Sequence, residues 1–178
     1  MSTIQVKDKF FKPFISSDEI QKAVCQVADK INKDLAGKNP IFICVLNGAF
    51  MFAADLYKNI TIDSEITFMR MKSYDGMQTT GKVKAISGLM EDIKDRTVVV
   101  VEDIVDTGYT MKNIIEQLKE KGAKEVKIAT LLHKPEALKV ELDLDYVALN
   151  IPNAFIVGYG LDYDELGRNL KDIYVIAE

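Results

Sequence analysis

Two adjacent carboxylates at the end of a run of valines have the clearest chemical potential in this sequence. Glu102 and Asp103 follow four consecutive valines at 98–101, and an Asp-Thr-Gly-Tyr-Thr loop occupies 106–110. Carboxylates accept hydrogen bonds from sugar hydroxyls or bind a divalent cation. The hydroxyls and backbone N–H groups of a loop with Thr and Gly suit a phosphate instead. The segment therefore predicts one site for a phosphate, a sugar and a metal ion.

Other phosphate-binding patterns do not fit this loop. Gly108 stands alone, so the loop is neither a GxGxxG fingerprint nor a Gly-rich loop ending in Gly-Lys-Ser/Thr. The structural alternative is a buried strand that ends in a solvated acidic turn. A single acidic residue would favour that alternative, whereas the complete ordered string favours a ligand site.

The elements around the loop follow from hydrophobic patterning. Four β-branched residues in a row are typical of a strand that is buried on both faces. An amphipathic helix is predicted to begin at about Thr110 and to stop at Gly122. The N-terminus of a helix offers free N–H groups and a positive dipole end. A phosphate is therefore expected at the start of this helix.

Strands alternate with helices along the rest of the chain, which favours a mainly parallel α/β sheet in one domain. Helices are predicted from residues 16–19 to Gly37 and over 50–57. Strands are predicted at 41–46, 65–74, 126–132, 146–151 and 173–176. Residues 75–81 have the composition of a mobile loop, and 82–90 is expected to return as the second strand of an antiparallel flap.

Three polar turns follow three of the predicted parallel strands, at 47–49, 102–110 and 133–135. An open α/β sheet binds its ligand outside the carboxyl ends of its strands. We therefore expect the three turns to converge on one site.

Composition narrows the class of protein. The chain has 178 residues, 48% of them hydrophobic, and a net charge of −4 without a long basic block, which argues against nucleic acid as a partner. Cys25 and Cys44 lack zinc-site or disulfide spacing and are predicted to be small core residues. With no signal pattern or membrane-spanning stretch, we expect a soluble, cytoplasmic protein without a membrane partner.

The string from Val98 to Thr110 resembles the 5-phosphoribosyl 1-pyrophosphate (PRPP) binding motif of type I phosphoribosyltransferases. Further segments resemble the hypoxanthine-guanine branch of that family, in the family's order: 46–49, 72–74, 131–134, 155–163 and Arg168. The resemblance covers about Ile41 to the end. It implies a type I phosphoribosyltransferase fold over 1–178: a central, mainly parallel sheet flanked by helices, a small hood from the N- and C-terminal segments, and an antiparallel flexible flap.

The activity implied is purine salvage. The 5-phosphoribosyl group of PRPP would pass to N9 of hypoxanthine or guanine, giving IMP or GMP and pyrophosphate. Breaking the bond between C1′ and pyrophosphate leaves positive charge on the ribose, so the transition state should be oxocarbenium-like. The partners implied are PRPP, a 6-oxopurine base and Mg²⁺, with a homodimer or homotetramer as the assembly.

The resemblance also implies roles for individual residues, with Asp106 as the general base near N7 of the purine. The ribose and phosphate of PRPP would be bound by Glu102, Asp103, Asp106, Thr107, Gly108, Tyr109 and Thr110. Pyrophosphate would be bound by Leu46, Asn47, Gly48 and Arg168. The purine would be bound by Ile104, Lys134, Phe155, Ile156 and Asp162, with Lys134 donating to O6 and Phe155 stacking. Ser73 and Tyr74 would belong to the flexible loop, and the Mg²⁺ ligands would be Glu102, Asp103 and Asp162.

Asn47 departs from the family pattern, in which other members carry Lys or Arg at this position. The family holds the preceding peptide bond in the cis form, so that backbone N–H groups face pyrophosphate. The neutral side chain leaves the strength of pyrophosphate binding open.

Two alternatives to the main interpretation stay open. One is a related phosphoribosyltransferase that prefers xanthine or another base, because backbone groups decide that preference. The other is a PRPP-sensing regulatory protein of the same fold. A regulator is expected to show a basic face and often to lack the general base, whereas this chain is acidic and carries Asp106.

Overall fold

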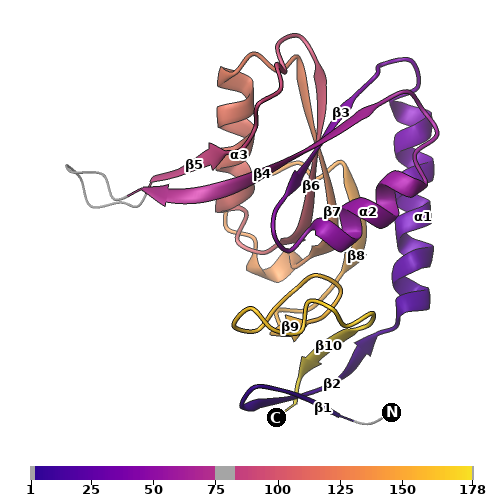
Figure 1. Cartoon of the computed structure of the whole chain (residues 1–178), viewed down its shortest axis with the longest axis vertical. Coiled ribbons are helices and arrows are strands. Elements are labelled where there is room, and N and C mark those ends of the chain that lie inside the picture. Colours follow the sequence, from indigo (N-terminus) through magenta and orange to yellow (C-terminus); the bar gives the residue numbers. More distant parts are fainter. Residues whose placement is uncertain (1–2, 75–82, 178) are drawn as a thin grey trace.

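The computed structural model describes residues 3–74 and 83–177, and it contains two sheets (Figure 1). The larger has six strands in the order β5-β4-β3-β6-β7-β8. Its strands are β3 (Ile41–Val45), β4 (Glu65–Tyr74), β5 (Val83–Ser87), β6 (Thr97–Val105), β7 (Glu125–His133) and β8 (Tyr146–Asn150). All neighbours are parallel except β4 and β5. The predicted mainly parallel sheet is therefore confirmed.

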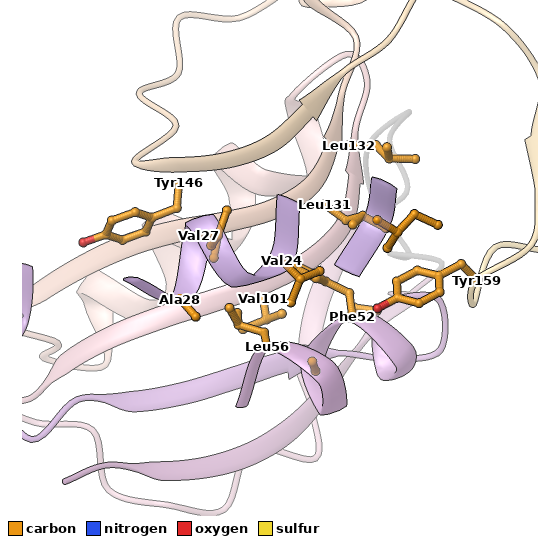
Figure 2. Close-up of a cluster of buried hydrophobic side chains, with 14 of the residues drawn as sticks. Val24, Val27, Ala28, Phe52, Leu56, Val101, Leu131, Leu132, Tyr146 and Tyr159 are labelled. Carbon is orange, nitrogen blue, oxygen red and sulfur yellow. The ribbon is translucent and has the colours of Figure 1, made fainter. Parts of the chain in front are cut away.

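Helices cover both faces of this sheet because alternate side chains of its central strands point to opposite sides. Val99 and Val101 of β6 pack with α1 (Ser17–Asp34) and α2 (Phe50–Lys58). Figure 2 shows this cluster, with Val101 between side chains of the two helices. The intervening valines pack with α3 (Tyr109–Glu120) on the other face. A short 3-10 helix, η1 (Pro135–Ala137), follows β7.

Helix α1 begins at the predicted residues. Ser16 is its N-cap, and its hydroxyl accepts from the backbone N–H of Glu19 while the Glu19 carboxylate accepts from the Ser16 N–H. The prediction that both cysteines lie in the core is wrong for Cys25. Cys44 is buried in β3, but Cys25 is exposed because it lies off the apolar stripe of α1.

The second sheet is a hood of four antiparallel strands built from both ends of the chain. It contains β1 (Ile4–Val6), β2 (Lys9–Ile15), β10 (Ile173–Ile176) and β9 (Ile156–Val157), in that order. Figure 1 shows the hood beyond the carboxyl end of β3, with both termini on it. Its own small core contains Val6, Phe11 and Val157. The implied hood is therefore present.

The antiparallel pairing of the predicted flap is confirmed. Strand β4 pairs with β5 from Arg70 opposite Ser87 to Tyr74 opposite Val83. Ser73 and Tyr74 lie at the end of β4, while the predicted loop at 75–81 lies outside the described residues. Within the described ranges, no helix is both long and apolar enough to cross a bilayer.

Candidate active site

The loop after β6 forms a small cavity at the start of α3. Gly108 is the N-cap of α3 with φ +86°, and a Cβ there would lie 2.7 Å from a methyl carbon of Val140. Among the described residues, no side chain caps the first turn of α3, so its N–H groups have no side-chain acceptor. A cavity of about 90 Å³ opens here, lined by residues including Glu102, Asp106, Thr107 and Thr110. The geometry suits an anion the size of a phosphate.

The two adjacent carboxylates lie at the inner end of this loop. Glu102 is only 8% exposed, and its Oε1 accepts from the Asp103 N–H at 3.0 Å. Asp103 Oδ1 accepts from the Ile104 N–H at 2.8 Å. Burial, and then the negative charge of Asp103, raise the pKa of Glu102 well above its ordinary value. Hydroxyl donors or a cation placed here would stabilise the ionised pair.

The turn after β3 lies against these carboxylates. The Leu46–Asn47 peptide bond is cis, as the resemblance implied. A Cβ on Gly48 would lie 1.7 Å from Asp103 Oδ2, and a Cβ on Gly160 would lie 2.3 Å from the Gly48 carbonyl oxygen. The turn is thus enclosed between Asp103 and the segment that carries Gly160. We call residues 155–168 the C-terminal segment. The first two of the three polar turns converge as predicted.

Replacing Gly48 by Ala tests this close approach. The new Cβ would force the Asp103 carboxylate to rotate, and because a side-chain end moves easily, the fold should survive. Loss of one hydrogen bond to a charged group corresponds to about 10- to 100-fold in affinity. We therefore expect KM for PRPP to rise by about tenfold or more, with a melting temperature within about 4 °C of the parent. Substrate kinetics and thermal unfolding measure the two effects.

The control for that variant is Gly122→Ala. Gly122 has φ +89°, so Ala there strains the backbone and should lower the melting temperature, but its nearest neighbour is the side chain of Lys94, away from the carboxylates. The variant thus controls for lost stability without a change at Asp103. It should leave KM for PRPP unchanged. An unchanged KM for PRPP in Gly48→Ala would contradict the importance of the Asp103 position.

The third turn joins the site through an ion pair. Lys134 Nζ lies 3.3 Å from Asp106 Oδ2 and 3.4 Å from Asn153 Oδ1. Lys134 is 8% exposed, which excludes the ordinary interpretation of a solvated surface lysine. Its backbone N–H donates to Val105 O at 3.0 Å, and the Lys139 N–H donates to Thr107 O at 3.0 Å. These bonds hold the loop after β6, which we call the phosphate loop, against the segment that contains Lys134 and Lys139.

An aromatic cluster of the hood begins two residues after Asn153, the hydrogen-bond partner of Lys134. Phe155 is 46% exposed, and its ring packs edge-on against Tyr163 at a centroid distance of 5.7 Å and tilted against Phe11 at 6.1 Å. The next residue, Ile156, is buried. A half-exposed ring with a fixed orientation is suited to stacking on a planar base.

Arg168 connects the rest of the C-terminal segment. It donates to Gly160 O at 2.8 Å and pairs with Asp162 at 3.0 Å and Glu165 at 3.2 Å. The second oxygen of Asp162 accepts from the Glu165 N–H at 2.8 Å. Both carboxylate oxygens of Asp162 therefore already have protein partners.

The structure brings together most, but not all, of the residues that the resemblance assigned to the site. Tyr109 is 58% exposed, so we assign no role to its ring. Among the described residues, no three His, Cys, Asp or Glu side chains form a group that could hold one metal ion by themselves. The predicted ligands Glu102, Asp103 and Asp162 are therefore not one preformed cluster.

Asn153 was not predicted from the sequence, although it contacts Lys134. It follows β8 directly after Ile151 and Pro152, and β8 is a further parallel strand of the sheet. The rule that ligands lie outside the carboxyl ends of parallel strands would have found this fourth polar turn as well.

Comparison with known proteins agrees with this geometry. The chain matches the phosphoribosyl transferase domain family over residues 16–164. It is 46% identical over 168 residues to the hypoxanthine-guanine phosphoribosyltransferase of Streptococcus pneumoniae. The matched region covers 94% of this chain and 93% of that relative. A solved hypoxanthine phosphoribosyltransferase of Staphylococcus aureus is 37% identical, with a TM-score of 0.86 and coverage of 93% of this chain and 91% of that one.

A more distant solved structure has the same architecture. The hypoxanthine phosphoribosyl transferase of Trypanosoma cruzi is 32% identical, with a TM-score of 0.84, and covers 98% of this chain and 95% of that one. The similarity thus extends through the hood as well as the core. With the phosphate loop, the enclosed turn after β3 and the buried lysine in place, the chain belongs to the phosphoribosyltransferase family, in its hypoxanthine-guanine branch.

Proposed function

We propose that this protein transfers the 5-phosphoribosyl group of PRPP to N9 of hypoxanthine or guanine, forming IMP or GMP and pyrophosphate. The observation that carries the proposal is the position of Asp106. It lines the cavity at the start of α3 and pairs with the buried Lys134. One carboxylate therefore lies between a site for the ribose phosphate and a cationic donor for a base.

The phosphate loop supplies the first part of the mechanism. Thr107, Gly108 and Thr110 bind the 5-phosphate at the uncapped start of α3, with the backbone of Tyr109. Glu102 and Asp103 accept hydrogen bonds from the ribose hydroxyls. Their negative charge also stabilises the oxocarbenium-like transition state, because positive charge develops on the adjacent ribose ring.

Lys134 and Asp106 act on the purine. The Lys134 ammonium group donates to O6, and Asp106 accepts the proton that leaves the purine at N7. The ring of Phe155 stacks on the base, while Ile104 and the backbone of Ile156 line the base site. Adenine has an amino group at position 6, so a donor at Lys134 selects 6-oxopurines.

Pyrophosphate leaves from the other side of the ribose. Asn47 and Gly48 bind it through backbone N–H groups, while the Leu46 N–H already donates to Met69 O at 2.9 Å and Leu46 only flanks the site. Arg168 contributes a planar pair of donors when the phosphate replaces its partners Asp162 and Glu165. Arg168 already contacts Gly160, whose backbone lies against Gly48. Ser73 and Tyr74 would exclude water from the reaction centre, which stays a prediction because the loop that follows them lies outside the described residues.

Glu102 and Asp103 fit a magnesium ion. Both are hard oxygen ligands, and because burial and the charge of Asp103 raise the pKa of Glu102, a cation beside the pair would stabilise its ionised form. Bound Mg²⁺ would supply that charge beside the ribose hydroxyls and the pyrophosphate. Asp162 fits a second ion less well, because Arg168 and the Glu165 N–H already occupy its oxygens.

Steady-state kinetics with four bases test the proposal. With PRPP and Mg²⁺, hypoxanthine and guanine should form nucleotide, xanthine should react more slowly, and adenine should give a kcat/KM at least about 10³-fold lower. Removal of Mg²⁺ by a chelator should abolish the reaction, and added Mg²⁺ should restore it. No nucleotide from either hypoxanthine or guanine would contradict the proposal, and a preference for xanthine would support the related enzyme instead.

Other features stay predictions. They are the single domain over 1–178, a cytoplasmic location, the homodimer or homotetramer, and the absence of a nucleic-acid partner. The relatives support the enzyme rather than a regulator, since they are named as phosphoribosyltransferases. Sedimentation analysis and nucleotide formation in the same preparation would test the assembly and the activity together.

A further inference from the structure

A partly buried hydrogen bond joins the C-terminal segment to the helix that follows the turn after β3. The Tyr159 hydroxyl donates to Asp55 Oδ2 at 2.6 Å. Asp55 lies on α2, and α2 begins immediately after the turn that contains Asn47 and Gly48. Tyr159 directly precedes Gly160, whose backbone lies against the Gly48 carbonyl. The two segments therefore meet twice, once at Gly48 and once at Asp55.

The surroundings of Tyr159 fix its position. It is 4% exposed and belongs to the core cluster on the α1 and α2 face of the sheet, where Figure 2 shows it. Its φ is +49°, a conformation that bulky side chains rarely adopt. The backbone N–H of Tyr159 donates to Leu170 O at 2.8 Å. A rare backbone conformation persists only where contacts on both sides hold it, and the bond to Asp55 is one of them.

The charges around this bond keep its proton on the tyrosine. Burial, and then the hydrogen bond and charge of Asp55, raise the pKa of Tyr159. Burial also raises the pKa of Asp55, but hydrogen bonds from Lys58, Tyr159 and Gln21 outweigh it and hold that pKa below its ordinary value. The phenol thus stays a donor and the carboxylate an acceptor throughout the working pH range.

We propose that Tyr159 and Asp55 are positioning residues that hold the turn after β3, which contains Asn47 and Gly48, against the C-terminal segment. The inference rests on the proposed function, because it assigns Gly48 to pyrophosphate. Neither residue needs to touch substrate: Tyr159 fixes α2, and α2 fixes the turn at its N-terminus. The base site depends instead on Phe155, which is held by Phe11 and Tyr163 of the hood. Loss of the bond should therefore weaken PRPP and pyrophosphate binding more than purine binding.

Tyr159→Phe tests the bond with the ring retained. We expect KM for PRPP and the inhibition constant of pyrophosphate to rise about threefold to tenfold, with KM for hypoxanthine within twofold of the parent. Asp55→Ala should give a similar split, and Asp55→Asn, which keeps an acceptor for Tyr159, should restore most of it. The double variant Tyr159→Phe/Asp55→Ala should be no worse than the poorer single variant.

Lys58→Ala is the matched control. Lys58 contacts the other oxygen of Asp55 at 2.7 Å from an exposed position, so its loss leaves the bond to Tyr159 intact. It should not change KM for PRPP. Equal increases in both substrates' KM values in Tyr159→Phe, or an increase for hypoxanthine alone, would overturn the proposal.

Direct binding separates this proposal from the proposed function. PRPP affinity is measured by calorimetry, which needs no turnover. A parent protein that binds PRPP but forms no nucleotide would refute the proposed function, while weaker PRPP binding by Tyr159→Phe would still support the positioning role. PRPP binding by Tyr159→Phe and Asp55→Ala that equals the parent's would refute that role.

Discussion

Asp106→Asn is expected to lower kcat by about 10²- to 10⁴-fold, the usual contribution of a general base, while KM for PRPP changes by no more than a few fold. The amide has nearly the same shape as the carboxylate, so the cavity at the start of α3 should keep its form. Asparagine also keeps an acceptor for Lys134, which lies 3.3 Å from Asp106 Oδ2. What it loses is the ability to take a proton from the purine.

The kinetic pattern distinguishes this role from phosphate binding. A residue that only bound the phosphate would raise KM for PRPP, whereas a base that acts in the transition state lowers kcat. Asp143→Asn makes the same chemical change at an exposed carboxylate between β7 and β8 and should have no effect. A kcat for Asp106→Asn within about threefold of the parent would show that another group removes the proton.

Patterning predicted the core of this fold because each core element carries its own signal. The valines at 98–101 are buried on both faces of β6, and β4 and β10 have the predicted bounds. The capping box of Ser16 and Glu19 is a local interaction, so sequence spacing alone identifies it.

Patterning did not predict the hood strands β1, β2 and β9. Strand β9 has two residues and β1 has three, too few to show an alternation. Strand β2 carries Pro13, which disfavours a strand assignment, and leaves Phe10 55% exposed. Only the family resemblance implied a hood, because its strands are stabilised by pairing between the two ends of the chain.

The features of the site that local patterns did not predict depend on contacts between residues far apart in the sequence. Lysine is seldom buried, and the buried Lys134 has its polar partners, Asp106 and Asn153, far away in the sequence. The bond between Tyr159 and Asp55 likewise leaves no trace in either local pattern. The error at Cys25 has a similar origin, since residue type favoured burial but the helical register decided exposure.

Lys134→Met should reduce selection for 6-oxopurines more than it reduces PRPP binding. Methionine has about the same length and fills the buried position, but it has no donor for O6. Loss of a hydrogen bond from a charged donor corresponds to about 10- to 100-fold. We expect kcat/KM to fall by about 10²-fold for both hypoxanthine and guanine. The low kcat/KM for adenine should not fall in parallel, because its 6-amino group does not accept a hydrogen bond from Lys134 and therefore loses none.

The ratio of kcat/KM for hypoxanthine to that for adenine is therefore the decisive measurement. A variant that was merely less stable, or that bound PRPP poorly, would slow both bases equally and leave this ratio unchanged. Lys139→Met provides the control, because Lys139 is exposed and only its backbone N–H contacts the phosphate loop, at Thr107. If Lys134→Met kept the parent ratio, Lys134 would serve only as the partner of Asp106, and the donor to O6 would have to be another group. Asn153, the other hydrogen-bond partner of Lys134, would be the next side chain to test.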